Sequence, residues 1–205
     1  MRDGLAVASS MLSRLNEDNK LANVVSALNL NRQSSSDKWE KIDFGQDYLD
    51  DFPHLSEEDL RSITLGSYQL RQARSYYAEH IKTDGRYVIE VCKHVGPLSL
   101  TSHGFSVGDP MLIRGRIQSR HRSATKYFVY ILIDRAIEID EDKDGVDSVS
   151  GYSCSCPNGL RTVGCCAHIA TVLWYLGFAR HESEILIPAE FLNNVCEELV
   201  GQEQE

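Results

Sequence analysis

The chain has 205 residues, of which 42% are hydrophobic and 25% are charged, a balance typical of a soluble globular protein with its own core. Its formal net charge of -9 excludes a protein that coats nucleic acid through bulk positive charge. The longest unbroken apolar run, Tyr127 to Ile133, is too short to cross a bilayer, so we expect no membrane partner.

The first predicted segment, residues 1–55, contains a helix and a linker. Leucine and valine side chains recur mostly at three- and four-residue steps up to Leu28, which is the period of an amphipathic helix. We expect this helix to pack on the rest of the chain, and the alternative is a coiled-coil or dimer helix. Residues 31–38 are polar and are predicted to be a linker, after which Trp39 is expected to anchor a loop onto the core.

The second predicted segment, residues 56–120, begins with a helix. Ser56, followed by Asp59 three residues later, resembles a capping box, in which each side chain accepts a hydrogen bond from the other residue's backbone N–H. An apolar stripe that continues as far as Ile81 predicts one continuous helix, and Gly85 is expected to stop it.

Strands are predicted after this helix, because the hydrophobic period changes to two from residue 86 onward. Residues 97–107 are expected to form a loop with a short strand at residues 98–100. The strand at residues 127–133 is apolar enough to be buried on both faces. Together the strands predict a small antiparallel meander, and they cover residues 87–92, 111–118, 127–133 and 148–154.

Two pairs of metal-binding residues lie close together in the third predicted segment, residues 121–182. Cys154 and Cys156 precede a loop that contains proline and glycine, and Cys166 and His168 follow it. Three thiolates and one imidazole are the ligand set of a closed tetrahedral zinc site, and proline and glycine suit a loop whose ends converge. We therefore predict one structural zinc ion, and the alternative is a cluster of buried free cysteines.

The positions of these residues predict how the ligands converge. Cys154 and Cys156 point to the same side of an extended strand, because strand side chains alternate. Cys166 and His168 would diverge by about 200° in a regular helix, so Cys166 must lie just before the helix or in a distorted first turn. Cys165 is the alternative ligand, but only Cys166 preserves the Cys-x-His spacing.

Cysteine usage predicts an intracellular, reducing compartment. The chain has six cysteines, and four of them lie within thirteen residues beside a histidine. The polar residues near the N-terminus do not fit a secretory signal. In a reducing compartment such a cluster favours a metal over disulfides.

Basic residues gather around the predicted turn between the strands at residues 111–118 and 127–133. No acid occurs from Met111 to Ile133, whereas seven acids follow between Asp134 and Asp147. Arginine side chains on a projecting turn are suited to bidentate contacts with phosphate, and the alternative is an internal charge match with the acidic segment. The predicted nucleic-acid contacts in this region are Arg114, Arg116, Arg120, Arg122 and Lys126.

The last predicted segment, residues 183–205, contains a short helix over residues 189–200 and a charged tail. The four segments together predict an α+β fold. We expect N-terminal helices, a small antiparallel β-meander, a zinc-stapled ββα unit and a short C-terminal helix.

The Cys-x-Cys and Cys-x-His pairs resemble the SWIM-type zinc finger. The neighbouring residues 161–164 and 174–181 are similar to the version found in eukaryotic transposon-derived proteins, and the similarity extends upstream through residues 65–76. The resemblance implies that the finger contacts DNA or protein, usually beside a transposase domain of the DDE type. It also implies a location in the nucleus.

We predict a binding module rather than an enzyme. A catalytic zinc keeps one coordination position open, whereas four protein ligands fill the predicted site. The sequence also lacks a P-loop and a carboxylate pattern that fits a two-metal nuclease. The expected contact surface is the zinc loop with Arg161 together with the basic turn. The alternatives are an adaptor that binds protein alone, and a fragment of a transposase whose catalytic domain is absent from this chain.

Overall fold

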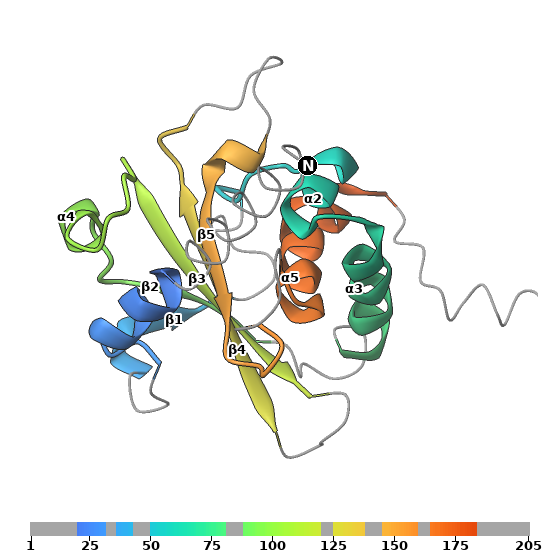
Figure 1. Cartoon of the computed structure of the whole chain (residues 1–205), viewed down its shortest axis with the longest axis horizontal. Helices are drawn as coiled ribbons and strands as arrows, with labels where there is room; N and C mark the ends of the chain where they lie inside the picture. Colours follow the sequence, from blue (N-terminus) through green and yellow to red (C-terminus); the bar gives the residue numbers. More distant parts are fainter. Residues whose placement is uncertain are drawn as a thin grey trace, which may run out of the picture.

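A single antiparallel sheet organises the fold. The computed structural model describes residues 20–31, 36–42, 50–80, 88–119, 125–137, 145–159 and 165–183. Within these ranges five strands pair in chain order, so the sheet is a meander (Figure 1). The strands are β1 (Trp39–Lys41), β2 (Val88–Cys92), β3 (Pro110–Gln118), β4 (Lys126–Asp134) and β5 (Val149–Cys154).

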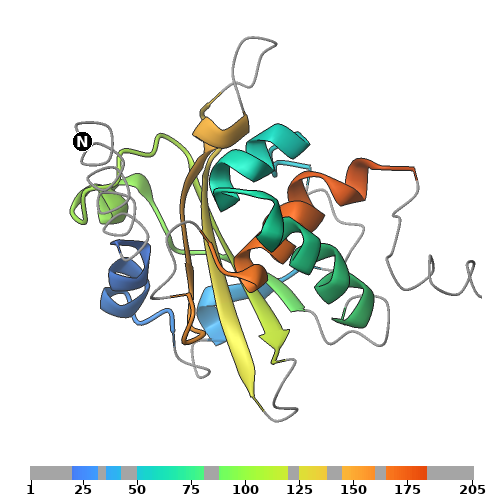
Figure 2. The ribbon, with the colours of Figure 1, turned by 45° about the vertical axis from the view of Figure 1, so that its right-hand side comes forward.

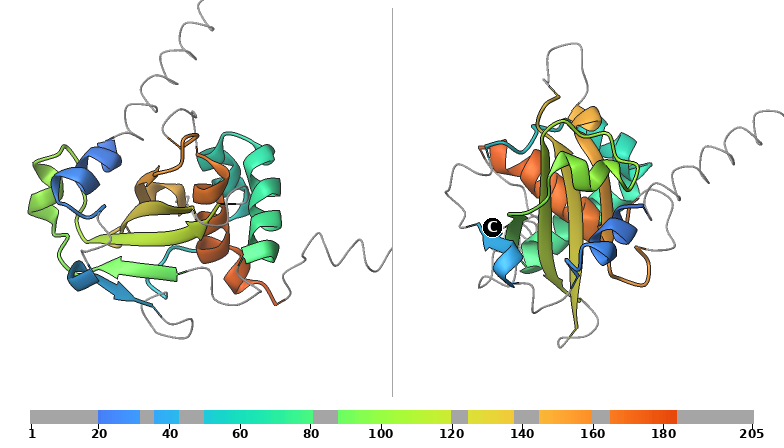
Figure 3. Two further views of the ribbon diagram at one scale, coloured as in Figure 1. Left: turned by 90° about the horizontal axis from the view of Figure 1, so that it is seen from below. Right: turned by 90° about the vertical axis from the view of Figure 1, so that its left-hand side faces the viewer.

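Helices cover both faces of the sheet. The helices α2 (Glu57–Thr64), α3 (Ser67–His80) and α5 (Ala167–Gly177) lie on one face (Figures 1 and 2). A helix over residues 20–27 and the short helix α4 (Pro97–Thr101) lie on the other face (Figure 3). Short 3₁₀ turns occur at Ser36–Lys38, Gly145–Ser148 and Ala179–His181. These elements confirm the predicted α+β fold with an antiparallel meander.

Strand alternation divides the buried side chains into two cores. Ile113, Val129 and Ile131 belong to the core under α2, α3 and α5. Leu112 and Leu132, their neighbours along β3 and β4, belong to the core under the helix over residues 20–27. Successive strand residues point to opposite faces, so an apolar central strand serves both cores. The prediction that residues 127–133 are buried on both faces holds for the part from Val129 onward.

The predicted long helix is wrong, because it is divided into α2 and α3. The capping box at Ser56 and Asp59 is present as predicted. At the other end of α2, Leu65 adopts a left-handed conformation with φ 57°, and Gly66 follows with φ 140°. Glycine has no Cβ, so it tolerates such values at little steric cost. The apolar stripe continues across the break because both helices pack on α5.

Two further predictions need correction, and two lie partly or wholly outside the described residues. Residues 98–100 are helical rather than extended, since they belong to α4, whose first turn contains Pro97. Trp39 is part of strand β1 rather than a loop, and it pairs with Cys92. The predicted helix at residues 189–200 is outside the described residues, as is the predicted N-terminal helix before residue 20. In the described part of the chain, no helix has the length and apolar character needed to cross a membrane.

We expect Gly177→Ala to destabilise the protein by about 1–3 kcal/mol, the usual cost of overpacking a core. A Cβ atom at this position would lie 2.6 Å from Cδ1 of Leu55. Leu55 has little room to move, since it is fully buried and its backbone N–H donates to the Gly177 carbonyl at 2.8 Å. Urea unfolding measures the loss. The loss should largely disappear in a Leu55→Ala background, and a loss of the same size there would contradict the steric explanation.

Candidate metal centre

The four predicted zinc ligands lie where strand β5 ends and helix α5 begins. Cys154 is the last residue of β5, and Cys156 follows it after one residue. Cys166 is the N-cap of α5, with the extended dihedrals φ -77° and ψ 166°, and His168 lies in the first helical turn. Because Cys166 stands just before the helix, its side chain is able to turn toward His168. The prediction that Cys166 must lie just before the helix, which followed from the Cys-x-His spacing, is therefore confirmed.

The donor atoms of these residues form a compact group. One donor atom from each of Cys154, Cys156, Cys166 and His168 lies within 4.8 Å of the others, and all four residues are buried. Nδ1 of His168 lies 3.9 Å from Sγ of Cys154 and 3.8 Å from Sγ of Cys166. A tetrahedron with Zn–S near 2.3 Å and Zn–N near 2.0 Å has edges of about 3.5–3.8 Å. The four residues therefore fit one zinc ion, with His168 binding through Nδ1.

Backbone N–H groups of the loop after β5 point at the sulfur atoms. The N–H of Cys156 donates to Sγ of Cys154 at 3.5 Å, and the N–H of Gly159 donates to Sγ of Cys156 at 3.1 Å. Such bonds stabilise the thiolate form and orient the ligands. The turn also needs a glycine at position 159, since a Cβ there would lie 2.8 Å from both Cβ and the carbonyl oxygen of Cys154.

Aromatic rings hold the imidazole of His168. The ring of Tyr76, from α3, meets it edge-on at a centroid distance of 5.1 Å, and the ring of Tyr127, from β4, lies tilted at 5.1 Å. Nε2 of His168 is buried and has no hydrogen-bond partner among the described residues. The ring is therefore oriented by packing rather than by an outer carboxylate. The sequence does not indicate the role of either tyrosine, because their positions along the chain are too far apart to show that both rings meet at His168.

Hydrogen bonds among the thiol groups determine which of them stay protonated without a metal. The hydrogen bond between Cys154 and Cys156 raises the pKa of Cys154 well above its usual value, and it lowers the pKa of Cys156. A hydrogen bond with Cys154 lowers the pKa of Cys166. The hydrogen bond with Cys156 and burial outweigh that effect, and they raise the pKa of Cys166 to about 12. These pKa shifts favour the thiolate form at Cys156 and the protonated form at Cys154 and Cys166 when no metal is bound.

Zinc binding at pH 7 is expected to release about two protons per ion, since Cys154 and Cys166 must become thiolates to bind the metal. Protons compete with zinc at these two groups, so the affinity should rise with pH, by up to about 100-fold per pH unit. Calorimetric titration in two buffers of different ionisation enthalpy measures the number of protons. Release of fewer than one proton would contradict the assignment of these two thiols.

The neighbouring cysteine does not belong to the metal-binding group. Cys165 is buried, but its sulfur is not one of the four donor atoms that lie within 4.8 Å of one another. The structure thus favours Cys166 over Cys165, in agreement with the Cys-x-His spacing.

Three of the six predicted nucleic-acid contacts lie in the described residues, and they differ in how exposed their side chains are. The prediction needs correction for Arg114, because its side chain is buried and its Nε donates to Glu90 at 2.7 Å. Arg116 donates to the same carboxylate at 3.1 Å and is partly exposed. Lys126, at the start of β4, is exposed. The remaining three predicted contacts lie outside the described residues, and they are Arg120, Arg122 and Arg161.

Comparison with known proteins agrees with the ligand set and its geometry. Residues 127–177 match the family model of the SWIM zinc finger, and this range contains all four ligands. The chain matches none of the curated proteins and none of the solved structures with which it was compared. The matched range includes most of β4, all of β5, the zinc loop and α5. The chain therefore contains a SWIM zinc finger, with Cys154, Cys156, Cys166 and His168 as the group able to bind its metal.

Proposed function

We propose that this chain is a binding module whose zinc ion is structural. The observation that carries the proposal is the closed group of four buried donors, which joins the end of the sheet to the start of a helix. A hairpin, a loop and one helix bury little apolar surface by themselves, so metal binding would contribute directly to the stability of this region. The zinc would hold the loop after Cys156 in place as part of a contact surface.

The same ligand group supports a protein without enzymatic activity. Catalytic zinc sites use three protein ligands and keep a position for water or substrate. Here three thiolates and one imidazole would fill a tetrahedral shell. A thiolate bound to zinc is also a weaker nucleophile than a free thiolate, because the sulfur shares its electrons with the metal. We therefore assign no reaction to this centre.

DNA is one proposed partner, and the candidate contact is the connection between β3 and β4. The two strands pair from Gln118 and Lys126 onward, and the sequence between them contains Arg120 and Arg122. Lys126 is exposed beside this connection. Cations at such a place are suited to phosphate contacts. A nuclear location and a transposon origin belong to the same proposal, and both are supported by the resemblance of the residues around the finger.

Salt dependence of DNA binding tests this proposal. The affinity of the zinc-loaded chain for a short duplex should fall linearly with salt on a logarithmic scale, with a slope of about -0.9 for each phosphate contact. Replacing Arg120 and Arg122 by alanine should reduce the slope by about two. Arg71→Ala, an exposed substitution on α3, is the matched control and should change nothing. Absence of binding at low salt would refute DNA as the partner.

A protein partner is the second candidate. The formal net charge of -9 opposes DNA binding over a large surface. The burial of Arg114 also removes one of the cations on which the DNA proposal was built. An adaptor that contacts protein through the zinc loop would keep its metal requirement and show no salt-dependent binding to a duplex.

A further inference from the structure

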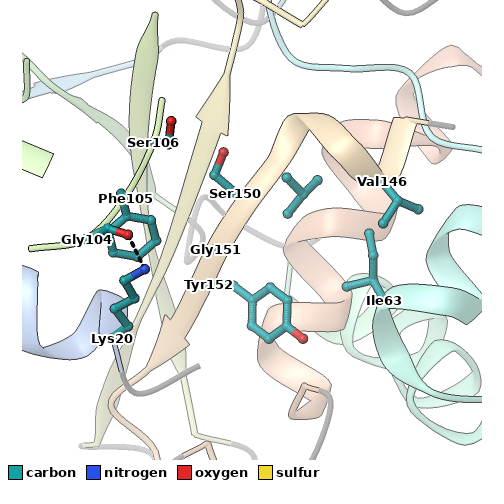
Figure 4. A pocket seen from close by; sticks show the side chains of 10 residues that line it. Lys20, Ile63, Gly104, Phe105, Ser106, Val146, Ser150, Gly151 and Tyr152 are labelled. Atoms are coloured by element: carbon teal, nitrogen blue, oxygen red, sulfur yellow. Dashed lines mark hydrogen bonds between the residues drawn. The ribbon is translucent and has the colours of Figure 1, made fainter. Parts of the chain in front are cut away.

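The face of the sheet that carries the helix over residues 20–27 is covered mainly at one end. There Phe105 belongs to the core on this face and lies beside Gly151 of β5 (Figure 4). Lys20 closes the same end, since its Nζ donates to the Gly104 carbonyl and lies 4.5 Å from the centre of the Phe105 ring. The hairpin of β3 and β4 extends beyond the helices on this face (Figure 2), so these helices leave its far end uncovered.

Side chains at the far end of this hairpin place cations beside an aromatic ring. Strand residues two apart share a face, so the even-numbered positions of β3 and β4 lie on this one, as Leu132 does. At the far end they are Arg116, Gln118, Lys126 and Phe128. Arg116 stands directly opposite Phe128, and Lys126 is two residues away along β4, at about 7 Å. The Arg116 side chain is 37% exposed, Lys126 is exposed, and Phe128 is half-buried.

This end of the sheet is positive in a protein whose formal net charge is -9. The sequence has no acid between residues 111 and 133, and β5 has no charged residue. Glu90 of β2 accepts from both Arg114 and Arg116, so its charge is offset within the sheet. Arg114, Arg116 and Lys126 against this one carboxylate leave two positive charges, which attract a polyanion.

The Phe128 ring is backed by the buried arginine. The Arg114 guanidinium lies 5.5 Å from the centre of the Phe128 ring and 4.1 Å from the centre of the Trp39 ring. Because Arg114 is buried, it packs on the inner side of the Phe128 ring, and the accessible part of the ring faces outward. Bases of nucleic acids stack on such rings while neighbouring cations contact the phosphates. A duplex keeps its base faces stacked on one another, whereas a single strand presents them.

We propose that this hairpin platform, which consists of Arg116, Lys126 and Phe128, binds single-stranded nucleic acid. A base would stack on Phe128, and the phosphates next to it would lie at Arg116 and Lys126. The inference rests on the proposed binding of nucleic acid and names its class, a strand with unpaired bases rather than a duplex. The platform contains none of the zinc ligands.

The experiment uses the zinc-loaded full chain and fluorescein-labelled homopolymers of about twelve nucleotides, a length within the usual range for one binding domain. The probes are a poly(dT) strand, a poly(rU) strand and the poly(dT)·poly(dA) duplex. Fluorescence anisotropy at low salt should give a dissociation constant below about 0.1 mM for a single strand. The duplex should bind at least about fivefold more weakly, because it offers no base to the ring. The strand that binds more tightly identifies whether the platform takes DNA or RNA.

Variants of the platform separate stacking from charge. Phe128→Leu should weaken binding of the strand at least about fivefold, whereas Phe128→Tyr, which retains the ring, should stay within about twofold of the natural sequence. Tyr68→Leu is the matched control and should change nothing, because this ring is 69% exposed on α3, which lies on the opposite face of the sheet. A thermal melt checks that Phe128→Leu remains folded. Lys126→Gln, an exposed substitution, should reduce the salt slope for the strand by about 0.7.

Three results would overturn the inference without refuting DNA as a partner. The first is binding of a single strand that Phe128→Leu leaves unchanged, and the second is a salt slope that Lys126→Gln leaves unchanged. The third is a duplex that binds as tightly as either strand. An absence of binding by every probe at low salt would refute the proposed nucleic-acid binding itself, and the inference with it.

Discussion

Replacing Cys154 by serine and His168 by alanine together is expected to abolish zinc binding and to lower the melting temperature by about 8–16 °C. A ligand present at about 1,000 times its dissociation constant stabilises the folded state by about 4 kcal/mol. In a protein of this size each kcal/mol corresponds to about 2–4 °C. The loss should concern the whole sheet, because Cys154 is the end of β5 and packs in the same core as Val129 and Ile131.

Thermal unfolding with and without a chelator measures this effect. The chelator should lower the melting temperature of the natural sequence by a similar amount and leave the double variant unchanged. Cys165→Ser is the matched control, because this buried neighbour stands outside the ligand group. Cys166→Ser should lose zinc, whereas Cys165→Ser should retain it. The opposite pattern would show that Cys165 is the third thiolate.

Glu90→Ala is expected to destabilise the protein by about 3–5 kcal/mol, because it leaves a buried arginine without its counter-ion. The Arg114 and Glu90 side chains are 4% and 9% exposed, and their ion pair measures 2.7 Å. The guanidinium group also lies 4.1 Å from the centre of the Trp39 ring, so it is enclosed on the face of the sheet that carries the helix over residues 20–27. Water is unable to replace the lost carboxylate at such a depth.

Urea unfolding of a matched set tests this explanation. Glu57 also bridges two arginines, Arg61 and Arg74, but its side chain is 39% exposed. Glu57→Ala should therefore cost no more than about 1 kcal/mol. Replacing Glu90 by leucine and Arg114 by methionine together should recover most of the stability, since a well-packed apolar pair often equals a buried ion pair. If Glu90→Ala lowered the free energy of unfolding by less than about 1 kcal/mol, the result would contradict the claim that buried Arg114 depends on Glu90 as its counter-ion.

The metal centre was predictable from the sequence because its ligands are local. Cys154 and His168 are fourteen residues apart, and the loop between them carries the turn residues that such a closure needs. The position of Cys166 before the helix followed from the same spacing. Strands β2 to β5 were predictable to within one residue, since alternation of apolar side chains is a short-range signal, whereas β1 was not predicted.

The other features depend on contacts between distant parts of the chain. The sequence predicts a surface cation at Arg114, because it does not show that Glu90 lies opposite this residue across β2 and β3. The break at Leu65 interrupts an apolar stripe that continues on both sides, so the period alone predicts one helix. Trp39 enters the sheet only because β2 offers it a pairing edge. Contacts between distant segments determine the burial of Arg114, the break at Leu65 and the pairing of Trp39. The local propensities of the residues do not indicate such contacts.

X-ray absorption at the zinc edge of the purified chain tests the central claim most directly. A structural zinc held by Cys154, Cys156, Cys166 and His168 predicts one zinc per chain. It also predicts three sulfur ligands at about 2.3 Å and one nitrogen at about 2.0–2.1 Å, with no water in the shell. A shell with two sulfur atoms and an exchangeable oxygen would contradict the account, because it would describe an open site able to perform chemistry.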